Sequence, residues 1–379
     1  MTGGTRGYPV RVIRLASLIA AIALVAACTS GPSTTSSPSP TATMDIKKSK
    51  LNISYAAMSD QDVHRATSKK ILDGAIAALK AEAKKTGGSE EFATLELQDT
   101  VDTIFADFQK FADATADFAR RNPQIAPDRI ADVAIEGMMS VSPDCHTYYV
   151  DKGGSVHRSR AESSTGTGPQ IPAGGTSLGG PDQIGLQAKL LDKGVVYITF
   201  NQFLVSGTYR VTDEVQKILD KGVAAGAKAW VFDLRGNIGG NGADLMASWF
   251  LNGEPTLKVV VKTGNAGTAT ANKDLRLGPA YQLPIAVILN GRGGSAPEVF
   301  AASLKENKRA TIVGSKSIGC LGATSPTAMS DGSTISVTVQ EFTGAVTGTP
   351  YNNNGIQPDV PASDDQAVAK AIEVVTTAK

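Results

Sequence analysis

The sequence has few of the residues that build metal sites, with only three cysteines and three histidines in 379 residues. No CxxC pair and no His/Cys cluster has metal-ligand spacing, so we expect no metal and no cofactor. The charges nearly cancel, with 37 Lys and Arg against 36 Asp and Glu, which argues against nucleic acid as a partner. Neither GxGxxG nor GxxxxGK[ST] occurs, which argues against a nucleotide phosphate loop. No stretch after residue 28 is apolar enough to span a bilayer.

The N-terminus has the pattern of an export signal. Three arginines precede an apolar run, Leu15 to Ala27, that is too short for a mature transmembrane helix. The run ends in Val-Ala-Ala-Cys, which resembles a bacterial lipoprotein signal over residues 1–28 with lipidation at Cys28. The alternative is an ordinary secretory signal. Residues 29–60 begin with a Ser/Thr/Pro-rich tract and are interpreted as a flexible tether. We therefore expect an exported protein, held by lipid at the outer face of the cell membrane.

The full sequence is 41% apolar, enough for a substantial core. Apolar residues at helical spacing predict an N-terminal helical subdomain over residues 61–145. A segment carrying one histidine and a glycine-rich linker follows over 146–182, and strands alternate with helices in 183–379. This alternation predicts an α/β core with parallel strands.

Within that core, Ser295 follows an apolar strand (285–289) and a glycine-rich turn, and precedes an amphipathic helix. A strand–turn–helix unit of this kind presents the serine at a helix N-terminus, where an acyl-transfer enzyme places its nucleophile and part of its oxyanion hole. The alternative is that Ser295 only caps the helix.

A second strand, residues 229–234, leads into the glycine-rich turn Arg235-Gly-Asn-Ile-Gly-Gly240, which can expose backbone N–H groups. A simple tight turn is the alternative. His146 lies in a short polar segment between a helix and an apolar run. It could serve as a base, or it could only satisfy backbone groups at a helix end.

Seven motifs in order resemble those of the tail-specific, or C-terminal processing, serine peptidases, relatives of the tricorn core protease and of the interphotoreceptor retinoid-binding modules. The motifs are DCHTYYV, GVVYITFNQF, VFDLRGNIGG, VILNGRGGSAPE, RATIVGSKSIG, DGSTISVTVQEF and GIQPDV. The resemblance covers roughly residues 127–377 and implies a crotonase-like α/β core. The family usually carries a PDZ domain before this core. The glycine-rich stretch from residue 151 to 187 is too short for one, so a form without it is expected.

The resemblance makes Ser295 the nucleophile, and it implies an oxyanion hole formed by the N–H groups of Gly239 or Gly240 and Ala296. The family lysine that lies 25 residues after the serine is replaced by Cys320. The tricorn-like branch uses a histidine instead, which His146 matches.

That branch orients its histidine with a glutamate, and Asn352 holds the corresponding place. We therefore expect Asn352 to orient His146. With the implied fold, Cys145 and Cys320 both lie near the site, and we predict a disulfide between them.

Two functions follow from this pattern. The first is a membrane-anchored serine endopeptidase that acts on proteins or peptides through Ser295 and His146. The alternative is a catalytically weak or inactive module that binds an apolar ligand or a protein partner, which the missing lysine and glutamate favour.

Overall fold

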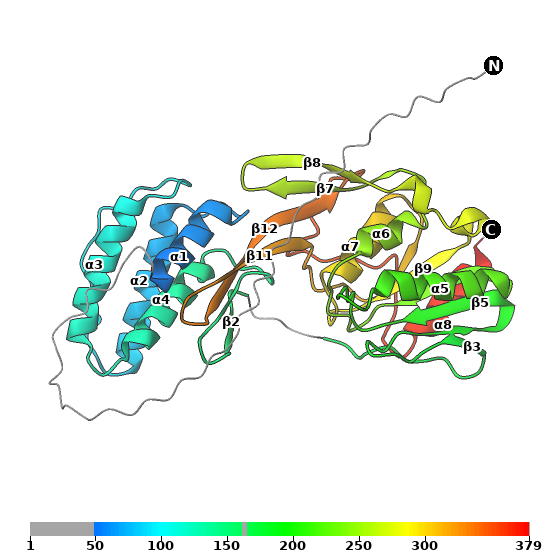
Figure 1. The fold of residues 1–379 in the computed structure, drawn as a ribbon, viewed down its shortest axis with the longest axis horizontal. Helices are drawn as coiled ribbons and strands as arrows, with labels where there is room; N and C mark the ends of the chain where they lie inside the picture. Colours follow the sequence, from blue (N-terminus) through cyan, green and yellow to red (C-terminus); the bar gives the residue numbers. More distant parts are fainter. Residues whose placement is uncertain (1–48, 161–164, 379) are drawn as a thin grey trace, which may run out of the picture. The chain divides into compact units, whose positions relative to one another are not determined.

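The computed structural model describes residues 49–160 and 165–378 (Figure 1). The predicted signal segment, Cys28 and most of the predicted tether lie outside the described residues. The tether prediction was wrong at its end, because Lys50–Ala56 forms helix α1 and Ala57–Gln61 forms the π-helix η2. Leu51, Tyr55 and Met58 recur at helical spacing and are buried, so this stretch belongs to the folded part.

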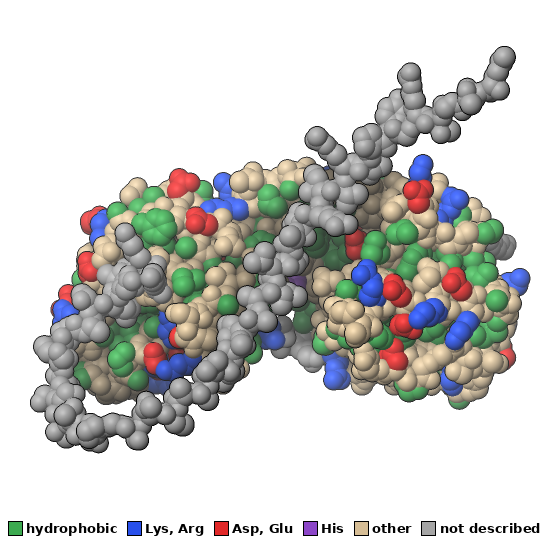
Figure 2. Space-filling model, in the orientation of Figure 1, with side chains coloured by type: hydrophobic (Ala, Val, Ile, Leu, Met, Phe, Trp, Pro, Cys, Tyr) green, Lys and Arg blue, Asp and Glu red, His purple; other side chains and the backbone are tan. Residues whose placement is uncertain are grey.

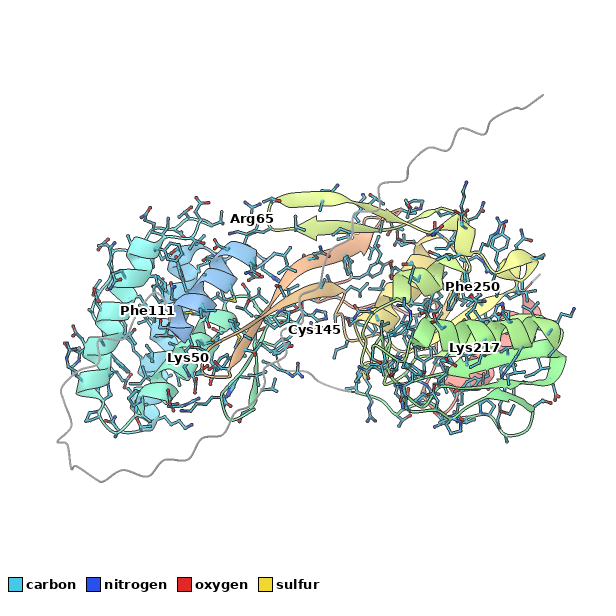
Figure 3. The ribbon with its side chains drawn as sticks, in the orientation of Figure 1. Lys50, Arg65, Phe111, Cys145, Lys217 and Phe250 are labelled. Atoms are coloured by element: carbon cyan, nitrogen blue, oxygen red, sulfur yellow. A yellow bond between two sulfur atoms is a disulfide. The ribbon has the colours of Figure 1, made fainter. Side chains whose placement is uncertain are left out.

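Three longer helices follow, α2 (Ser68–Lys85), α3 (Phe105–Arg121) and α4 (Pro127–Ser140). The phenylalanine seam of α3 is buried, and Figure 3 places Phe111 among these helices. Helix α3 begins only at Phe105, so the residues between α2 and α3 are not helical. The Asp107 carboxylate accepts a hydrogen bond from the N–H of Gln98 at 2.6 Å, which holds the preceding segment as a non-helical strap.

The larger sheet has seven strands in the order β13-β10-β9-β6-β5-β4-β3. Neighbours from β13 to β5 are parallel, which confirms the predicted parallel core, whereas β3 and β4 are antiparallel. The bounds are β3 (Thr176–Gly179), β4 (Gln187–Leu190), β5 (Val195–Thr199), β6 (Ala229–Asp233), β9 (Ile285–Leu289), β10 (Thr311–Gly314) and β13 (Val360–Pro361). Short 3₁₀ turns, η3 (Asp192–Gly194), η4 (Lys273–Leu275) and η5 (Gly278–Gln282), lie between elements.

Helices cover both faces of this sheet. The face that includes Val196 and Ile198 packs with α5 (Val211–Ala224), α6 (Ala243–Ser248) and α7 (Ala296–Glu306). The opposite face, which includes Val195 and Tyr197, packs with α8 (Ala367–Thr377). Burial on both faces explains why the central strands are continuous apolar runs rather than alternating ones.

A second sheet joins segments that are far apart in the sequence. Its order is β2-β1-β12-β7-β8, and β11 pairs with the other edge of β12. The bounds are β1 (Tyr148–Val150), β2 (Val156–Arg158), β7 (Pro255–Val261), β8 (Gly264–Thr270), β11 (Gly322–Ala328) and β12 (Thr334–Gly344). The segment predicted as a histidine loop and linker, 146–182, therefore contains β1, β2 and β3. All three strands are short, and β2 and β3 are also largely exposed, which is why they were missed.

One strand, β12, contacts both the helices α1 to α4 and the core of the larger sheet. Its first residues pair with β1, and its last residues pair with β7. Ile335 and Val337 belong to the core that the helices α1 to α4 share, and Phe342 packs against the core of the larger sheet. Because β1 follows His146 directly, this pairing fixes where that histidine lies.

The surface carries both signs of charge. On the face drawn in Figure 2, Lys and Arg are interspersed with Asp and Glu over the coloured part of the molecule. Within residues 49–160 and 165–378, no helix combines the length and the hydrophobicity that crossing a membrane requires.

Candidate active site

Ser295 lies at the junction between the turn after β9 and the start of α7. Its backbone adopts φ 70° and ψ −118°, a region that residues other than glycine rarely occupy. Its N–H donates a hydrogen bond to Oε2 of Glu298 at 2.9 Å, which helps to hold this conformation. A serine held at positive φ on a strand-to-helix turn is typical of an exposed nucleophile.

His146 lies beside this serine. Its Nε2 is 3.4 Å from Oγ of Ser295, although the two residues are 149 positions apart in the sequence. The ring is mostly buried, with 15% of the side chain exposed. The structure therefore brings together the two residues that the sequence proposed as base and nucleophile.

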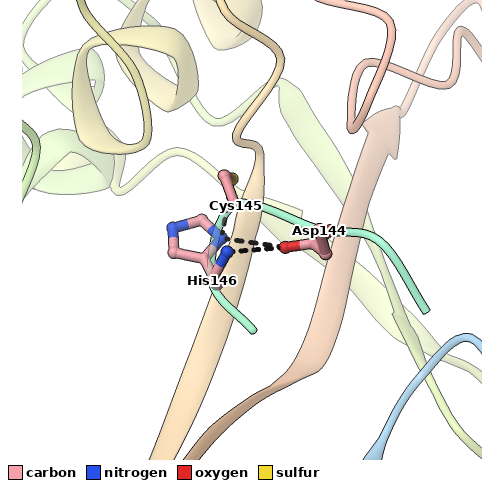
Figure 4. Close-up of side chains that lie close together, drawn as sticks. All are labelled: Asp144, Cys145 and His146. Atoms are coloured by element: carbon pink, nitrogen blue, oxygen red, sulfur yellow. Dashed lines mark hydrogen bonds and ion pairs between the residues drawn. The ribbon is translucent and has the colours of Figure 1, made fainter. Parts of the chain in front are cut away.

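The carboxylate beside the imidazole belongs to Asp144, which sequence reasoning did not single out. Figure 4 shows Asp144, Cys145 and His146 together. Oδ1 of Asp144 accepts from the His146 N–H at 2.8 Å and lies 3.7 Å from its Nδ1. Burial alone would raise the pKa of Asp144, but the nearby His64 imidazole and hydrogen bonds from Thr338, the His146 N–H and Asn352 hold it well below its usual range. Asp144 is therefore an anion next to the imidazole.

Asn352 does not orient His146, so that prediction was wrong. Its Nδ2 donates to Oδ2 of Asp144 at 2.7 Å and to Oε1 of Glu341 at 2.9 Å. Its buried Oδ1 has no hydrogen-bond partner among the described residues. Asn352 therefore supports the carboxylate beside His146 and not the imidazole itself. The motif DCHT contains both Asp144 and His146, and this two-residue spacing is the signal that could have identified the carboxylate.

The three N–H groups predicted for the oxyanion hole differ in whether they already donate a hydrogen bond. The N–H of Gly239 donates to Oδ1 of Asn237 at 3.0 Å, so it is already engaged. Within the described residues, no hydrogen bond uses the N–H of Gly240 or of Ala296. A Cβ on Gly239 would lie 2.7 Å from Cβ of Ser295 and 3.1 Å from its Oγ, which explains why this turn requires glycine there. The N–H groups of Gly240 and Ala296 therefore remain available as hydrogen-bond donors.

A buried ion pair fixes the glycine turn. Nε of Arg235 donates to Oδ1 of Asp233 at 2.9 Å, and Nη2 donates to Oδ2 at 2.7 Å, with both side chains fully buried. Nη1 donates to the carbonyl of Asp364, and the Tyr197 hydroxyl donates to Asp233 at 2.9 Å. This bidentate pairing ties the turn after β6 to the sheet and to the segment before α8.

Glu298 joins the serine to a neighbouring segment. This buried carboxylate accepts from the N–H groups of Ser295, Gly319 and Cys320, and from the Ser317 hydroxyl. Burial raises the pKa of Glu298, although these four donors oppose the rise.

The same neighbouring segment carries a disulfide. The structure places it between Cys145 and Cys320, whose Cα atoms are 5.9 Å apart, and this is the pair favoured from the sequence. Cys145, labelled in Figure 3, directly precedes His146, so the bond connects the histidine segment to the serine segment. Cys320 in a disulfide cannot replace the basic lysine of the family.

A pocket of about 580 Å³ opens beside the serine and the histidine. Its walls include the apolar side chains Leu257, Val259, Val299 and Phe342. Ile238 also lines it and is 71% exposed. An exposed apolar side chain next to an apolar pocket is a common mark of a binding site.

The other two histidines both lie next to carboxylates. His64 precedes α2 and contacts Asp62, Asp144 and Glu341. Burial alone would lower the pKa of His64, but the nearby carboxylates of Asp144 and Asp62 raise it to about 10. His157 lies in β2, with its two ring nitrogens at 3.1–3.2 Å from carboxylates of two different residues.

Among the residues that the structure describes, two groups of side chains have the composition of a metal site. The first is Asp144, Cys145 and His146, but the Cys145 sulfur is in the disulfide and offers no thiolate. The second is His64, Asp144 and Glu341.

Comparison with known proteins agrees with the geometry. Residues 194–362 match the family described as Peptidase family S41. The chain is 28% identical over 251 residues to a carboxyl-terminal-processing protease of Synechocystis sp., covering 60% of this chain and 53% of that protein. It is 28% identical over 178 residues to the carboxy-terminal processing protease CtpA of Bacillus subtilis, covering 46% and 36%. The chain thus spans about half or less of the length of these curated relatives.

A solved structure from Parabacteroides merdae shares the fold, with a TM-score of 0.51 at 17% identity over 80% of this chain and 96% of that one. The family resemblance predicted from the seven motifs is confirmed, and it supports a peptidase function. The chain contains a domain of peptidase family S41 and is homologous to proteins named carboxyl-terminal processing proteases.

Proposed function

We propose that the protein is a serine endopeptidase in which His146 is the general base for Ser295. The observation that carries this proposal is the 3.4 Å separation between Nε2 of His146 and Oγ of Ser295. Catalytic hydrogen bonds are often long before substrate binds, so this distance is compatible with proton transfer. Nε2 accepts the hydroxyl proton as Oγ attacks the peptide carbonyl, and the imidazolium then protonates the leaving amine.

Two further groups support the charges that this reaction creates. Asp144 lies beside Nδ1 of His146 as a buried anion, where it favours the Nδ1–H tautomer and stabilises the imidazolium. The N–H groups of Gly240 and Ala296 are the donors for the oxyanion. Asp144 takes the role that the sequence assigned to Asn352.

We infer that the substrates are proteins or peptides with an apolar side chain near the cleaved bond. The apolar walls of the pocket next to Ser295 support this inference, because burying such a side chain there removes apolar surface from water. The names of the processing-protease relatives are compatible with protein substrates.

A fluorophosphonate probe tests the mechanism, because it reacts with an activated serine. We expect labelling of Ser295, loss of labelling in Ser295→Ala, and unchanged labelling in Ser303→Ala, a serine of α7 whose hydroxyl is bonded to the Val299 carbonyl. His146→Ala should abolish labelling, and labelling that survives in that variant would contradict the assignment of the base.

The second candidate function is an inactive binding module for an apolar ligand. The observation that favours it is Cys320, which stands at the family lysine position and is closed in a disulfide. Absence of labelling in the folded wild-type protein, together with a co-purifying apolar ligand, would support this alternative and exclude the peptidase.

We also propose that the protein is exported and lipid-anchored through Cys28, on the basis of the signal pattern in residues 1–28. Cys28→Ala should abolish incorporation of an alkyne-labelled fatty acid and move the protein out of the membrane fraction.

We further propose that the larger sheet is the crotonase-like core of the family and that α1 to α4 form its N-terminal helical subdomain. The parallel strands with intervening helices support this assignment.

A further inference from the structure

Three side chains from distant segments, His64, Asp144 and Glu341, lie close together near His146. Nε2 of His64 lies 3.5 Å from Oδ2 of Asp144 and 3.4 Å from Oε1 of Glu341. All three ligand-type atoms lie within 4.8 Å of one another. His64 comes from the turn before α2, Asp144 from the segment before β1, and Glu341 from β12.

The spacing of these atoms suits a metal better than direct hydrogen bonds. A charged N–H···O bond measures about 2.7–2.9 Å, which is shorter than both contacts of His64. Tetrahedral ligands at about 2.0–2.2 Å from zinc lie about 3.3–3.6 Å from one another. Within the described residues, Nε2 of His64 is buried and has no hydrogen-bond partner of normal geometry.

A third carboxylate positions the imidazole from its other side. Nδ1 of His64 lies 2.8 Å from Oδ1 of Asp62, which is fully buried. This contact keeps a proton on Nδ1 and directs Nε2 toward Asp144 and Glu341. The arrangement of carboxylate, histidine and open ligand position is the one that surrounds many metal-bound histidines.

The charge of the cluster also favours a bound cation. Asp62, Asp144 and Glu341 surround one imidazole, and none of the three pairs with Lys or Arg within residues 49–160 and 165–378. Even with His64 protonated, the cluster keeps excess negative charge, which a divalent cation would neutralise.

Asn352 offers a fourth ligand. It is only 7% exposed, its Nδ2 contacts both Asp144 and Glu341, and its buried Oδ1 is without a hydrogen-bond partner in the described part of the chain. A half-turn of the amide would place Oδ1 beside the same two carboxylates. Amide oxygen, carboxylate oxygen and imidazole nitrogen together form a donor set that suits a divalent metal.

We propose that His64, Asp144, Glu341 and the Asn352 amide bind one divalent transition-metal ion, with zinc as the best match. The ion would hold Oδ2 of Asp144, whose other oxygen contacts His146, so it would act as a positioning element for the histidine. The sequence predicted no metal because these ligands are separated by 80, 197 and 11 residues and form no local motif.

Zinc binding to the full-length protein tests the proposal and needs no turnover. After removal of metal with a chelator, zinc sulfate is titrated against a chromophoric competitor. We expect one zinc ion per wild-type chain and a rise in Tm on zinc addition. In His64→Ala the affinity should fall at least about 100-fold and the zinc-dependent rise in Tm should disappear.

Two variants complete the test. Glu341→Gln, at a partly exposed position, should also weaken zinc binding, and it is a second measurement if His64→Ala does not fold. His157→Ala is the matched control, because the nitrogens of His157 face Glu136 and Asp151 separately, and its affinity should equal that of wild type. A wild-type protein that takes up no zinc, or His64→Ala binding zinc as tightly as wild type, would overturn the proposal.

Discussion

The backbone of Ser295 predicts an unusual order of stability for two substitutions. At φ 70° and ψ −118°, a side chain of any kind is strained, whereas glycine is not. Ser295→Ala keeps the strain, and Ser295→Gly releases it. Both variants lose the hydroxyl and its contact with His146, so the comparison isolates the backbone term.

The expected difference follows from two opposing quantities. A non-glycine residue in a sparsely populated conformation costs about 1–3 kcal/mol. Glycine in place of alanine lowers stability by about 0.4–1 kcal/mol, because the unfolded chain gains freedom. We therefore expect Ser295→Gly to be more stable than Ser295→Ala by about 0.5–2 kcal/mol.

Urea unfolding, followed by circular dichroism, measures this difference. The control pair is Ser303→Gly and Ser303→Ala, in the interior of α7, where the order should reverse because glycine costs about 1 kcal/mol in a helix. If Ser295→Gly were less stable than Ser295→Ala by the ordinary helical amount, the conformation described for the serine would be wrong.

Three further predictions concern the surroundings of the site. Asp144→Asn should slow fluorophosphonate labelling about 10²–10⁴-fold while the far-ultraviolet spectrum is retained, because it removes the anion beside the imidazole; a rate within threefold of wild type would refute this role. Reducing the Cys145–Cys320 disulfide, which closes a loop of 175 residues, should lower the free energy of unfolding by about 2–5 kcal/mol, and equal urea midpoints with and without reductant would contradict it. Burial alone would raise the pKa of Glu306, but hydrogen bonds from Tyr351, Thr347 and two N–H groups lower it. The ionised Glu306 therefore stabilises the fold at pH values above the pKa of the unfolded chain. This stabilisation is lost as the pH falls through the pKa of the folded state. Glu306→Gln should therefore cost about 1–3 kcal/mol at pH 7 and progressively less in acid, and a gap that widened in acid would show the sign to be wrong.

The elements that the sequence predicted well are those with a strong local signal. The strand before Ser295 and the strand at 229–233 are apolar on both faces, so their burial could be read from composition alone. The hairpin β7–β8 could not be predicted, because β8 consists of Gly, Asn, Ala and Thr and is almost fully exposed. Its pairing depends on β7 and not on its own sequence.

The site residues also separate into those that a local motif predicts and those that it does not. Ser295 and His146 could be proposed from motifs, because each motif places one reactive side chain at the end of an element. The support for His146 could not, since it depends on which amide and which carboxylate meet in space. Asn352 was expected to contact the imidazole, but its Nδ2 donates to Asp144 instead, across 208 positions of the sequence.

The long strand β12 makes the helices indispensable to the rest of the chain. Ile335 and Val337 are fully buried against α1 to α4, whereas the other end of the same strand is hydrogen-bonded to β7. A fragment without these helices would expose both side chains to solvent on β12. An exposed apolar strand tends to associate with other copies of the chain. The helices α1 to α4 and the larger sheet are therefore expected to unfold in one transition, and the part of the chain without these helices should not be obtainable as a monodisperse fragment.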